Sequence, residues 1–295
     1  MNVIVKDRDD RLKIALKSHE KTLEQLQEDV NIIKEWLKTQ KHLPETPHDH
    51  VIQNFLLLNK FSIETTKQKL DMYYTIRSLL PEVFENKHPN SPHMQQNMKA
   101  IYAVPVPELT DEGHCVAFLR IASESSNILD LDPYMIFSHI YNIAEVRLHE
   151  DVALGDVYVY DMAYFPFRQI ARLNPKVFSS RVKALHILNA PAYAEPLIKL
   201  VKQLLNPKLS DRIHIHDSLE SLRKCLPNKV LPKEYGGDLP PLGEINETWI
   251  KAFEKYAERF DKMAKLKVNE QLRPTPLVND DILGIYGNFK KLNVD

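Results

Sequence analysis

The stretch RVKALHILNAP, from Arg181 to Pro191, decides the fold of this chain. Its apolar and β-branched residues predict a strand that stops at Asn189 and Pro191, because proline cannot continue a central ladder. An apolar helix follows, and the segment from Arg212 to His216 returns as a second short strand. The order strand, helix, strand predicts a β-α-β unit with a right-handed crossover and a parallel sheet beneath it.

The helix between these two strands carries more apolar residues than one buried face requires. Four of its apolar residues repeat at helical spacing, and three more widen the stripe. These seven residues are Ala194, Leu197, Ile198, Leu200, Val201, Leu204 and Leu205. We therefore expect this helix to form the wall of a pocket.

The N-terminal third of the chain predicts a small helical lobe. Helical periodicity covers residues 8–39, 51–58 and 63–80, and breakers separate these blocks. Residues 81–92 are polar and flanked by prolines, which indicates a linker. We place the helical lobe and its linker together at residues 1–92.

The rest of the chain predicts a larger α/β lobe at residues 93–240. Strand-like and helical segments alternate ahead of the β-α-β unit, which is typical of a mainly parallel sheet with flanking helices. These segments are 100–104, 115–121, 133–150 and 157–161. Residues 241–295 begin with an amphipathic helix over 245–266, and we expect this helix and the tail to pack on the body.

Composition excludes several classes of protein but does not indicate a particular reaction or ligand. The chain has 295 residues, 43% of them apolar, and a net charge of -1, so wholesale nucleic-acid binding is not indicated. No apolar run approaches the ~20 residues that span a bilayer. The charged N-terminus and the two cysteines predict a cytoplasmic protein without a disulfide framework.

Five separated motifs occur in an order that resembles the CRAL-TRIO family, which includes retinaldehyde-binding and tocopherol-transfer proteins. They are FLLLNKFSIETTKQKLDMYYTIRSLLPEVF (55–84), GDVYVYDM (155–162), KALHILNAP (183–191), LNPKLSDRIHIH (205–216) and LPKEYGG (231–237). The resemblance covers nearly everything from about residue 25 onward. It implies an α/β lipid-binding lobe with a hydrophobic cavity, a mobile gate helix and no catalysis.

The resemblance also assigns candidate ligand residues. The gate helix falls on residues 192–205, which agrees with its excess of apolar residues. The cavity wall falls on Ile136, Phe137, Ser138, Ile140, Tyr141, Asn142, Val157, Val159, Tyr160 and Leu188. Ser138 and Asn142 lie one helical turn apart and would orient a ligand hydroxyl or carbonyl. The alternative, of equal weight, is that they satisfy each other or a buried water.

Four basic residues, Arg181, Lys183, Lys208 and Arg212, match a phosphoinositide-binding cleft in the tocopherol-transfer branch of the family. The same four residues also follow from strand geometry, since Arg181 and Lys183 share a strand face. Arginine offers a planar fork to phosphate and lysine a point charge. The competing interpretation is four solvated surface cations.

Two departures from the family pattern bear on function. The segment near 165–181 is about ten residues shorter than expected and lacks a helix that normally closes one side of the cavity. In addition, Leu56-Leu57-Leu58-Asn59 replaces a basic pattern that contacts phosphate, with Lys60 as a partial substitute. Phosphoinositide exchange is therefore less secure than cavity binding.

Metal binding and catalysis are the weaker alternatives. His214 and His216 share a strand face, but no carboxylate or cysteine lies nearby in sequence, so we interpret them as ordinary strand histidines. A hydrolase that uses Asp161 and His186 ranks third among the hypotheses, because the chain has no G-x-S-x-G elbow and no P-loop.

The sequence thus predicts a cytoplasmic protein that binds a hydrophobic small molecule in a gated apolar cavity and transfers it at membrane surfaces. Its expected partners are a retinoid, tocopherol, carotenoid or phospholipid ligand, a transient membrane surface and phosphoinositides. No cofactor, metal, nucleic-acid partner or enzymatic activity is expected. The alternative is a protein-interaction adaptor that keeps the fold around a degenerate or closed cavity.

Overall fold

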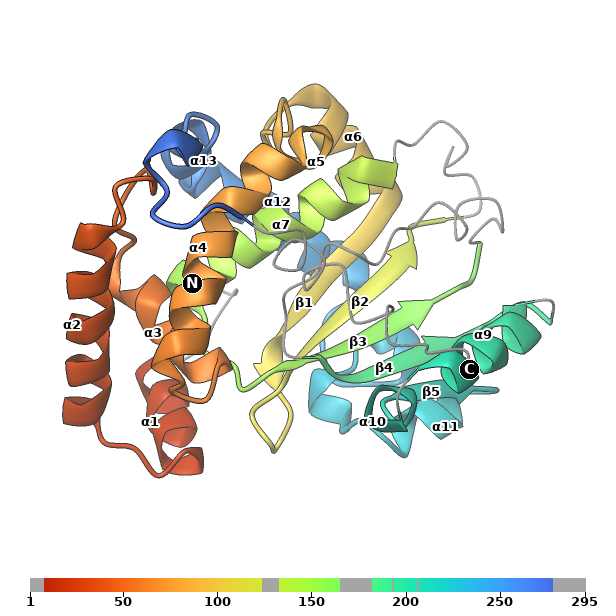
Figure 1. Ribbon diagram of the computed structural model, residues 1–295. Coiled ribbons are helices and arrows are strands. Elements are labelled where there is room, and N and C mark those ends of the chain that lie inside the picture. Colours follow the sequence, from red (N-terminus) through yellow and green to blue (C-terminus); the bar gives the residue numbers. More distant parts are fainter. Residues whose placement is uncertain (1–7, 124–132, 165–181, 193, 206, 278–295) are drawn as a thin grey trace, which may run out of the picture.

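The computed structural model describes residues 8–123, 133–164, 182–192, 194–205 and 207–277. Its centre is a five-stranded sheet flanked by helices, with a separate group of helices beside one end (Figure 1). This arrangement confirms the predicted fold class, an α/β lobe preceded by a helical region.

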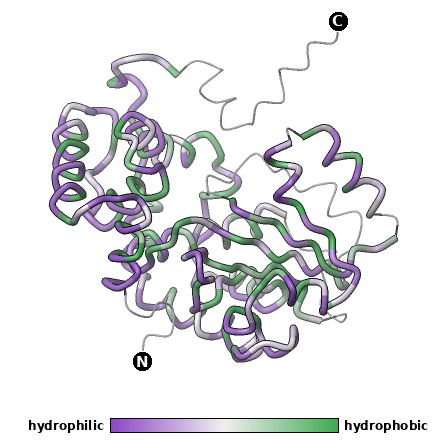
Figure 2. The backbone as a smooth tube through the Cα atoms, turned by 90° about the horizontal axis from the view of Figure 1, so that it is seen from below, coloured by the Kyte–Doolittle hydropathy of each residue, from purple (hydrophilic) through white to green (hydrophobic). Residues whose placement is uncertain are grey.

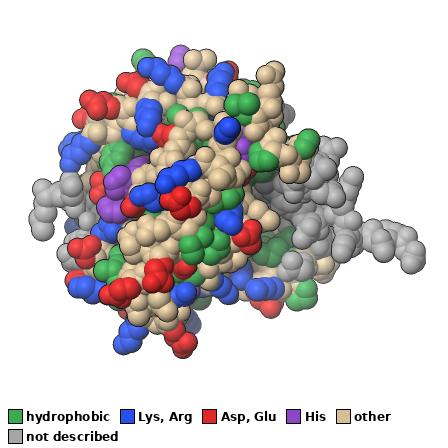
Figure 3. Space-filling view, turned by 60° about the vertical axis from the view of Figure 1, so that its left-hand side comes forward, with side chains coloured by type: hydrophobic (Ala, Val, Ile, Leu, Met, Phe, Trp, Pro, Cys, Tyr) green, Lys and Arg blue, Asp and Glu red, His purple; other side chains and the backbone are tan. Residues whose placement is uncertain are grey.

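Four helices form the N-terminal lobe: α1 (Arg8–Ser18), α2 (Leu23–Thr39), α3 (Asp49–Leu58) and α4 (Ile63–Leu79). Thr22 starts α2 through a capping box with Gln25, and Ser62 caps α4 by accepting a hydrogen bond from the Thr65 amide. The lobe core includes Leu56 and Leu57, both essentially unexposed. Acidic and basic side chains are interspersed over the face of this lobe (Figure 3).

One short helix lies within the predicted linker over 81–92, and a second starts at its last residue. Pro81 occupies the first turn of α5 (Pro81–Phe84), and Pro92 that of α6 (Pro92–Ala100) after the cap Ser91. Proline fits there because its fixed φ suits a helix start, where its missing N–H has no partner to lose. The predicted linker over 81–92 thus holds one helical turn at its start, and residues 85–91 lead to α6 without helix.

The sheet has the strand order β1-β2-β3-β4-β5. Strands β1 and β2 are antiparallel and the other neighbouring pairs are parallel, which agrees with the predicted, mainly parallel sheet. The strands are β1 (Ile101–Leu109), β2 (Cys115–Ile121), β3 (Asp156–Asp161), β4 (Val182–Leu188) and β5 (Ile213–His216).

The crossover helices decide which face of the sheet can hold a ligand. Helix α7 (Pro133–Glu150) joins β2 to β3, and α9 (Ala194–Leu204) with α10 (Pro207–Ser210) joins β4 to β5. Since the strands advance in one direction, right-handed crossovers place α7 and α9 on the same side. We call this side the front face, and Figure 1 shows both helices on it, with α12 behind the sheet.

The opposite side, the rear face, is covered by the segments that follow β5. These are α11 (Leu219–Arg223), η2 (Asn228–Val230), η3 (Lys233–Tyr235) and α12 (Leu242–Lys255). The chain then continues as α13 (Ala257–Met263) and η4 (Glu270–Leu272) beside the helical lobe, where Arg259 donates to Glu45 and the Asn269 amide donates to the His42 carbonyl. Trp249 and Phe253 of α12 pack into the core behind the sheet. Hydrophobic residues follow the strands between these layers (Figure 2).

The C-terminal part differs in one respect from the prediction. The expected single helix over 245–266 is two helices, because Tyr256 leaves helical geometry at φ -95° and ψ 9°. Its hydroxyl donates a 2.5 Å hydrogen bond to Glu150 at the end of α7. This contact fixes the corner between α12 and α13 against the body. The expected packing of residues 280–295 lies outside the described residues.

Candidate functional site

A cavity of about 200 Å³ lies between α7 and the front face of the sheet. Helix α7 contributes five residues at successive turns, namely Phe137, Ile140, Ile143, Ala144 and Arg147. The sheet contributes side chains that alternate along β1 to β4, among them Ala103, Ala117, Leu119, Tyr158, Tyr160 and Leu185. Most of these groups are apolar or aromatic, which is the composition of small-molecule pockets.

Small side chains keep this space open. Ala103, Ala117 and Ala144 face the cavity from β1, β2 and α7. An alanine on both sides of a helix–sheet interface leaves a gap that leucine or phenylalanine would fill. The hollow therefore follows from three alanines in adjacent elements.

Arg147 is the one formal charge among the cavity-lining residues described. Its guanidinium lies 3.1 Å from Asp151 and 2.8 Å from Asp156. Burial alone would lower the pKa of Arg147, but the two carboxylates outweigh it and raise this pKa. The paired charge closes one end of the cavity and leaves the remaining wall apolar.

The structure separates the predicted cavity residues into three groups. Phe137, Ile140 and Tyr160 line the cavity. Ile136 packs beside it against Ile101 and Ile121. The other predicted residues point elsewhere.

Val157, Val159 and Leu188 belong to the solid core behind the sheet and do not line this cavity. The physical reason is strand alternation, since side chains on neighbouring positions point to opposite faces. On β3, Tyr158 and Tyr160 face the cavity, whereas Val157 and Val159 face the rear.

The polar residues of α7 face the N-terminal helices. Ser138 Oγ donates to the Val83 carbonyl at 2.6 Å, and Asn142 Nδ2 donates to the Lys87 carbonyl at 3.1 Å. The Tyr141 ring lies 4.7 Å from that of Phe84. These three side chains hold α5 and the following turn on α7, so their described partners are backbone and aromatic groups of the protein.

Helix α9 occupies the predicted position of the gate. Ala194 is buried at its start, Ile198 and Leu205 are half-buried, and Leu200 is 51% exposed. Lys202 Nζ donates to the Ile213 carbonyl at 2.6 Å, which ties the helix to β5. The side chains of Leu197, Val201 and Leu204 lie outside the described part of the chain.

Of the four predicted phosphate-binding residues, Arg181 lies outside the described residues. Lys183 is half-buried on β4, and Lys208 is exposed on α10. Arg212 donates from its guanidinium to the Val182 carbonyl at 2.7 Å. The start of β4 and the start of β5 are thereby joined beside Lys183.

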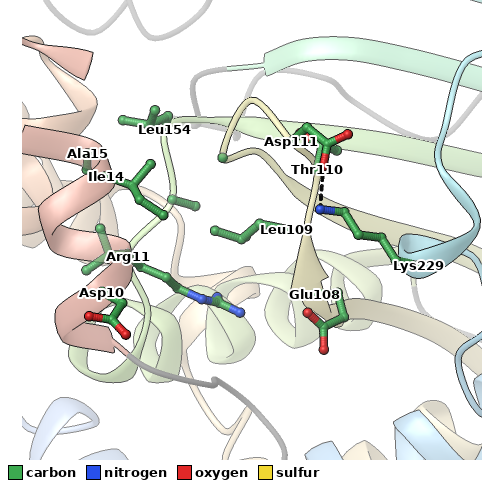
Figure 4. Close-up of a pocket in the computed structure, with 13 residues that line it drawn as sticks. Asp10, Arg11, Ile14, Ala15, Glu108, Leu109, Thr110, Asp111, Leu154 and Lys229 are labelled. Carbon is green, nitrogen blue, oxygen red and sulfur yellow. Dashed lines mark hydrogen bonds and ion pairs between the residues drawn. The ribbon is translucent and has the colours of Figure 1, made fainter. Parts of the chain in front are cut away.

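A second hollow of about 340 Å³ lies between α1 and the hairpin of β1 and β2 (Figure 4). Charged side chains from several elements line it, including Asp10, Arg11, Glu108 and an ion pair of Lys229 with Asp111 at 2.6 Å. Such walls suit water or polar solutes better than an apolar ligand.

Comparison with known proteins assigns the two parts of the chain to domain families. Residues 152–237 match the CRAL/TRIO domain, and residues 22–94 match the Pinta-like UBA domain. The chain therefore carries a CRAL/TRIO domain at residues 152–237. The human alpha-tocopherol transfer protein-like protein is 27% identical over 287 residues, covering 90% of this chain and 80% of the relative. Human clavesin-2 is 25% identical over 208 residues, covering 65% of this chain and 63% of the relative.

One carboxylate brings together three of the motifs of this CRAL-TRIO domain. Asp161 at the end of β3 accepts hydrogen bonds from Tyr235 Oη at 2.9 Å and from Asn189 Nδ2 at 2.7 Å. Arg120 Nε lies 3.7 Å away. Sequence reasoning assigned no role to the Tyr235 and Arg120 side chains, although the LPKEYGG motif, which contains Tyr235, was a signal for the first. The motifs GDVYVYDM, KALHILNAP and LPKEYGG therefore meet in space at Asp161.

The hypothetical hydrolase pair is not assembled in this way. Asp161 bonds to Tyr235 and Asn189, whereas His186 bonds to His216 on the rear face. Burial, with a smaller contribution from His216 and His214, lowers the pKa of His186 to about 4. His186 is therefore neutral at pH 7, and its Nδ1 forms a hydrogen bond with His216 rather than with Asp161.

The described helices include none whose length and hydropathy would allow it to cross a bilayer. The shortened segment near 165–181 lies outside the described residues. Among the described residues, α7 and the strands that face it line the cavity.

Proposed function

We propose that this CRAL-TRIO protein binds a hydrophobic small molecule in the cavity between α7 and the front face and transfers it between membranes. The observation that carries the proposal is an apolar hollow between the sheet and one of its crossover helices. Apolar burial contributes about 25 cal/mol per Å² and so favours entry of an oily ligand. Binding and release require no covalent step, so the proposed function is not enzymatic.

The ligand class is a retinoid, tocopherol, carotenoid or phospholipid. The name of the tocopherol transfer-like relative supports a lipophilic ligand. The described cavity of about 200 Å³ is smaller than the ~300 Å³ at which ligand pockets usually begin. It therefore suits the narrow apolar part of such a molecule, with the remainder directed toward α9.

Release is proposed to occur at membranes through movement of α9, assisted by phosphoinositide head groups. Exposed Leu200 on α9 and Leu209 just after Lys208 on α10 offer apolar side chains to a membrane surface. The adjacent cation of Lys208 favours anionic head groups, which attract basic side chains near the surface. Lys183, Arg212 and Arg181 complete the proposed basic group.

The cavity proposal is tested by filling the hollow. Ala144→Phe places a ring in the cavity, and we expect uptake of fluorescent retinoid, tocopherol and sterol probes to fall by at least ~10-fold, about 1.4 kcal/mol. Native mass spectrometry of the purified wild type should show a retained lipid that the variant lacks. Overpacking costs typically about 1–3 kcal/mol, so thermal unfolding must show that the variant is folded.

Ala153→Phe is the matched control, since Ala153 lines the charged hollow beside α1 and not the apolar cavity. It should leave uptake unchanged. Wild-type protein that is uniformly free of lipid and takes up none of the probes would contradict the proposal. So would equal uptake by wild type and a folded Ala144→Phe variant.

The small volume of the cavity favours one second candidate, a protein-interaction adaptor that keeps the fold without cargo. In that case lipid would be absent from purified protein, and Ala144→Phe would alter neither probe uptake nor partner binding. The same pair of measurements therefore separates the two functions.

A further inference from the structure

Two histidines and a cysteine meet on the rear face of the sheet, away from the proposed lipid cavity. His186 comes from β4, His216 from the end of β5, and Cys225 from the turn after α11. One ring nitrogen of each histidine and the cysteine sulfur lie within 4.8 Å of one another. The two histidines are buried, whereas Cys225 is exposed, so the group is open to solvent on one side.

The hydrogen bonds around His216 favour one of its two tautomers. Ser221 Oγ donates its single hydrogen to the Ser218 carbonyl at 2.9 Å. With its hydrogen placed there, it accepts from His216 Nδ1, which lies 2.9 Å away. His216 Nε2 is then a bare acceptor, and His186 Nδ1 donates to it at 2.7 Å.

This arrangement is the one in which a histidine binds a metal. A ligating imidazole presents one lone pair and gives its other N–H to a fixed acceptor, which sets its tautomer and its orientation. For His216 that acceptor is Ser221 Oγ. Ser221 on α11 thus orients the His216 ring so that its Nε2 lone pair faces the side chains of His186 and Cys225.

We propose that His186 Nδ1, His216 Nε2 and Cys225 Sγ bind Zn²⁺, with the fourth position left to water. Imidazole nitrogen and thiolate sulfur are both ligands of this borderline-soft cation, and hard cations such as Mg²⁺ prefer oxygen ligands. The site involves none of the residues that line the lipid cavity, so it stands independently of the proposed function.

Only side-chain movement is needed to form the complex. Bonds of about 2.0–2.3 Å in a tetrahedron separate the ligand atoms by roughly 3.3–3.6 Å. The imidazoles part slightly, and the exposed Cys225 turns inward. The thiol releases one proton to solvent, while His186 stays neutral because its hydrogen moves from Nδ1 to Nε2 by exchange with water.

A bound ion would fasten the turn after α11 to the ends of β4 and β5. Helix α9 lies between β4 and β5 in the chain. A bound ion would therefore cross-link the two strands that flank this helix. A ligand that binds only the folded state raises the melting temperature as its concentration rises.

The test is titration of the reduced, untagged full-length protein with Zn²⁺ and with Co²⁺ as a spectroscopic probe. We expect one ion per chain, a sulfur-to-Co²⁺ charge-transfer absorption, and a melting temperature that rises with Zn²⁺. Cys225→Ser should abolish the absorption and weaken Zn²⁺ binding by more than ~10-fold, while Ser221→Ala should weaken it by roughly 10-fold or more.

Two variants serve as controls. His214→Gln changes a histidine on the same strand whose ring stacks 5.0 Å from that of His186 but which is not one of the three ligands, so binding should persist. Cys115→Ser removes the other, buried cysteine and should leave the absorption in place. The proposal is overturned if the wild type binds no stoichiometric ion, if Cys225→Ser binds as tightly, or if the absorption depends on Cys115.

Discussion

Gly237 of the LPKEYGG motif shows how one atom decides a local fold. A Cβ at this position would collide with the Leu231 carbonyl oxygen, which is rigid backbone. The turn brings Tyr235 to Asp161 and therefore anchors the rear layer to β3. We predict that Gly237→Ala destabilises the protein by about 2–4 kcal/mol, within the range for strained backbone and a lost buried contact.

Urea unfolding would measure this change in free energy. Gly243→Ala is the matched control, because a Cβ there meets only Tyr102 Oη at 3.4 Å and the residue lies in the first turn of α12. Alanine is favoured over glycine in helices by about 1 kcal/mol, so this variant should be neutral or more stable. Equal stability of the two variants would show that the turn tolerates a side chain.

At this scale the sequence predicted some residues and not others. The family resemblance assigned Tyr160, Val157, Val159 and Leu188 alike to the cavity wall. Tyr160 faces the cavity and the other three face the rear, because alternation along a strand fixes two faces without saying which is which. The sequence also did not predict that His186 and Cys225 lie close together. They are 39 positions apart, and only the folding of β4, β5 and α11 brings them into one group.

For helices too, the sequence predicted where an element lies in the chain but not which way its side chains face. The periodicity of residues 133–150 predicted α7 with its bounds, and the apolar excess predicted α9. The orientation of α7 about its axis was not fixed, because apolar residues surround most of it. Its Ser138 and Asn142 consequently face α5 and the turn that follows it, where carbonyl oxygens of Val83 and Lys87 accept their hydrogen bonds.

The α9–α10 element carries a prediction about membranes. Lys208→Glu reverses an exposed cation beside Leu209, and we expect cosedimentation with phosphoinositide-containing vesicles to fall by roughly 5-fold at low salt. Each basic side chain near an anionic surface contributes about 1 kcal/mol, and this attraction weakens as salt screens it. Binding to uncharged phosphatidylcholine vesicles should not change.

Lys224→Glu is the control, since it makes the same charge reversal on the exposed cap of α11. Vesicle binding that drops equally in both variants would indicate a general charge effect. Unchanged binding by Lys208→Glu would contradict the proposed role of the basic group.

At the scale of the whole molecule, buried ion pairs join parts that are distant in sequence. Glu145 on α7 accepts from Tyr73 Oη on α4 at 2.5 Å and from Arg259 Nε on α13 at 2.8 Å. Arg259 also donates to Glu45 at 2.9 Å, and Arg273 lies 2.7 Å from Asp71. The C-terminal segment thus ties the helical lobe to the sheet lobe through charges, which hydrophobic periodicity does not encode.

The pKa of Glu145 makes this tie sensitive to acid. Burial alone would raise the pKa, but His149 and the charges of Arg77 and Arg259 outweigh burial and lower it from 4.5 to about 2. A group with a depressed folded pKa contributes its stability fully above pH 4.5 and loses it as the pH falls toward 2. Wild-type stability should therefore decline through that window.

Glu145→Gln removes the carboxylate and leaves Arg259 with a neutral amide in a buried site. We expect a loss of about 3–5 kcal/mol at pH 7, the range for breaking a buried ion pair, together with a flatter dependence on pH below 4.5. Urea unfolding between pH 7 and pH 3 measures both effects. Glu254→Gln, at an exposed position of α12, should stay within about 0.5 kcal/mol of the wild type. If Glu145→Gln and the wild type lose stability in parallel on acidification, other carboxylates hold the lobes together.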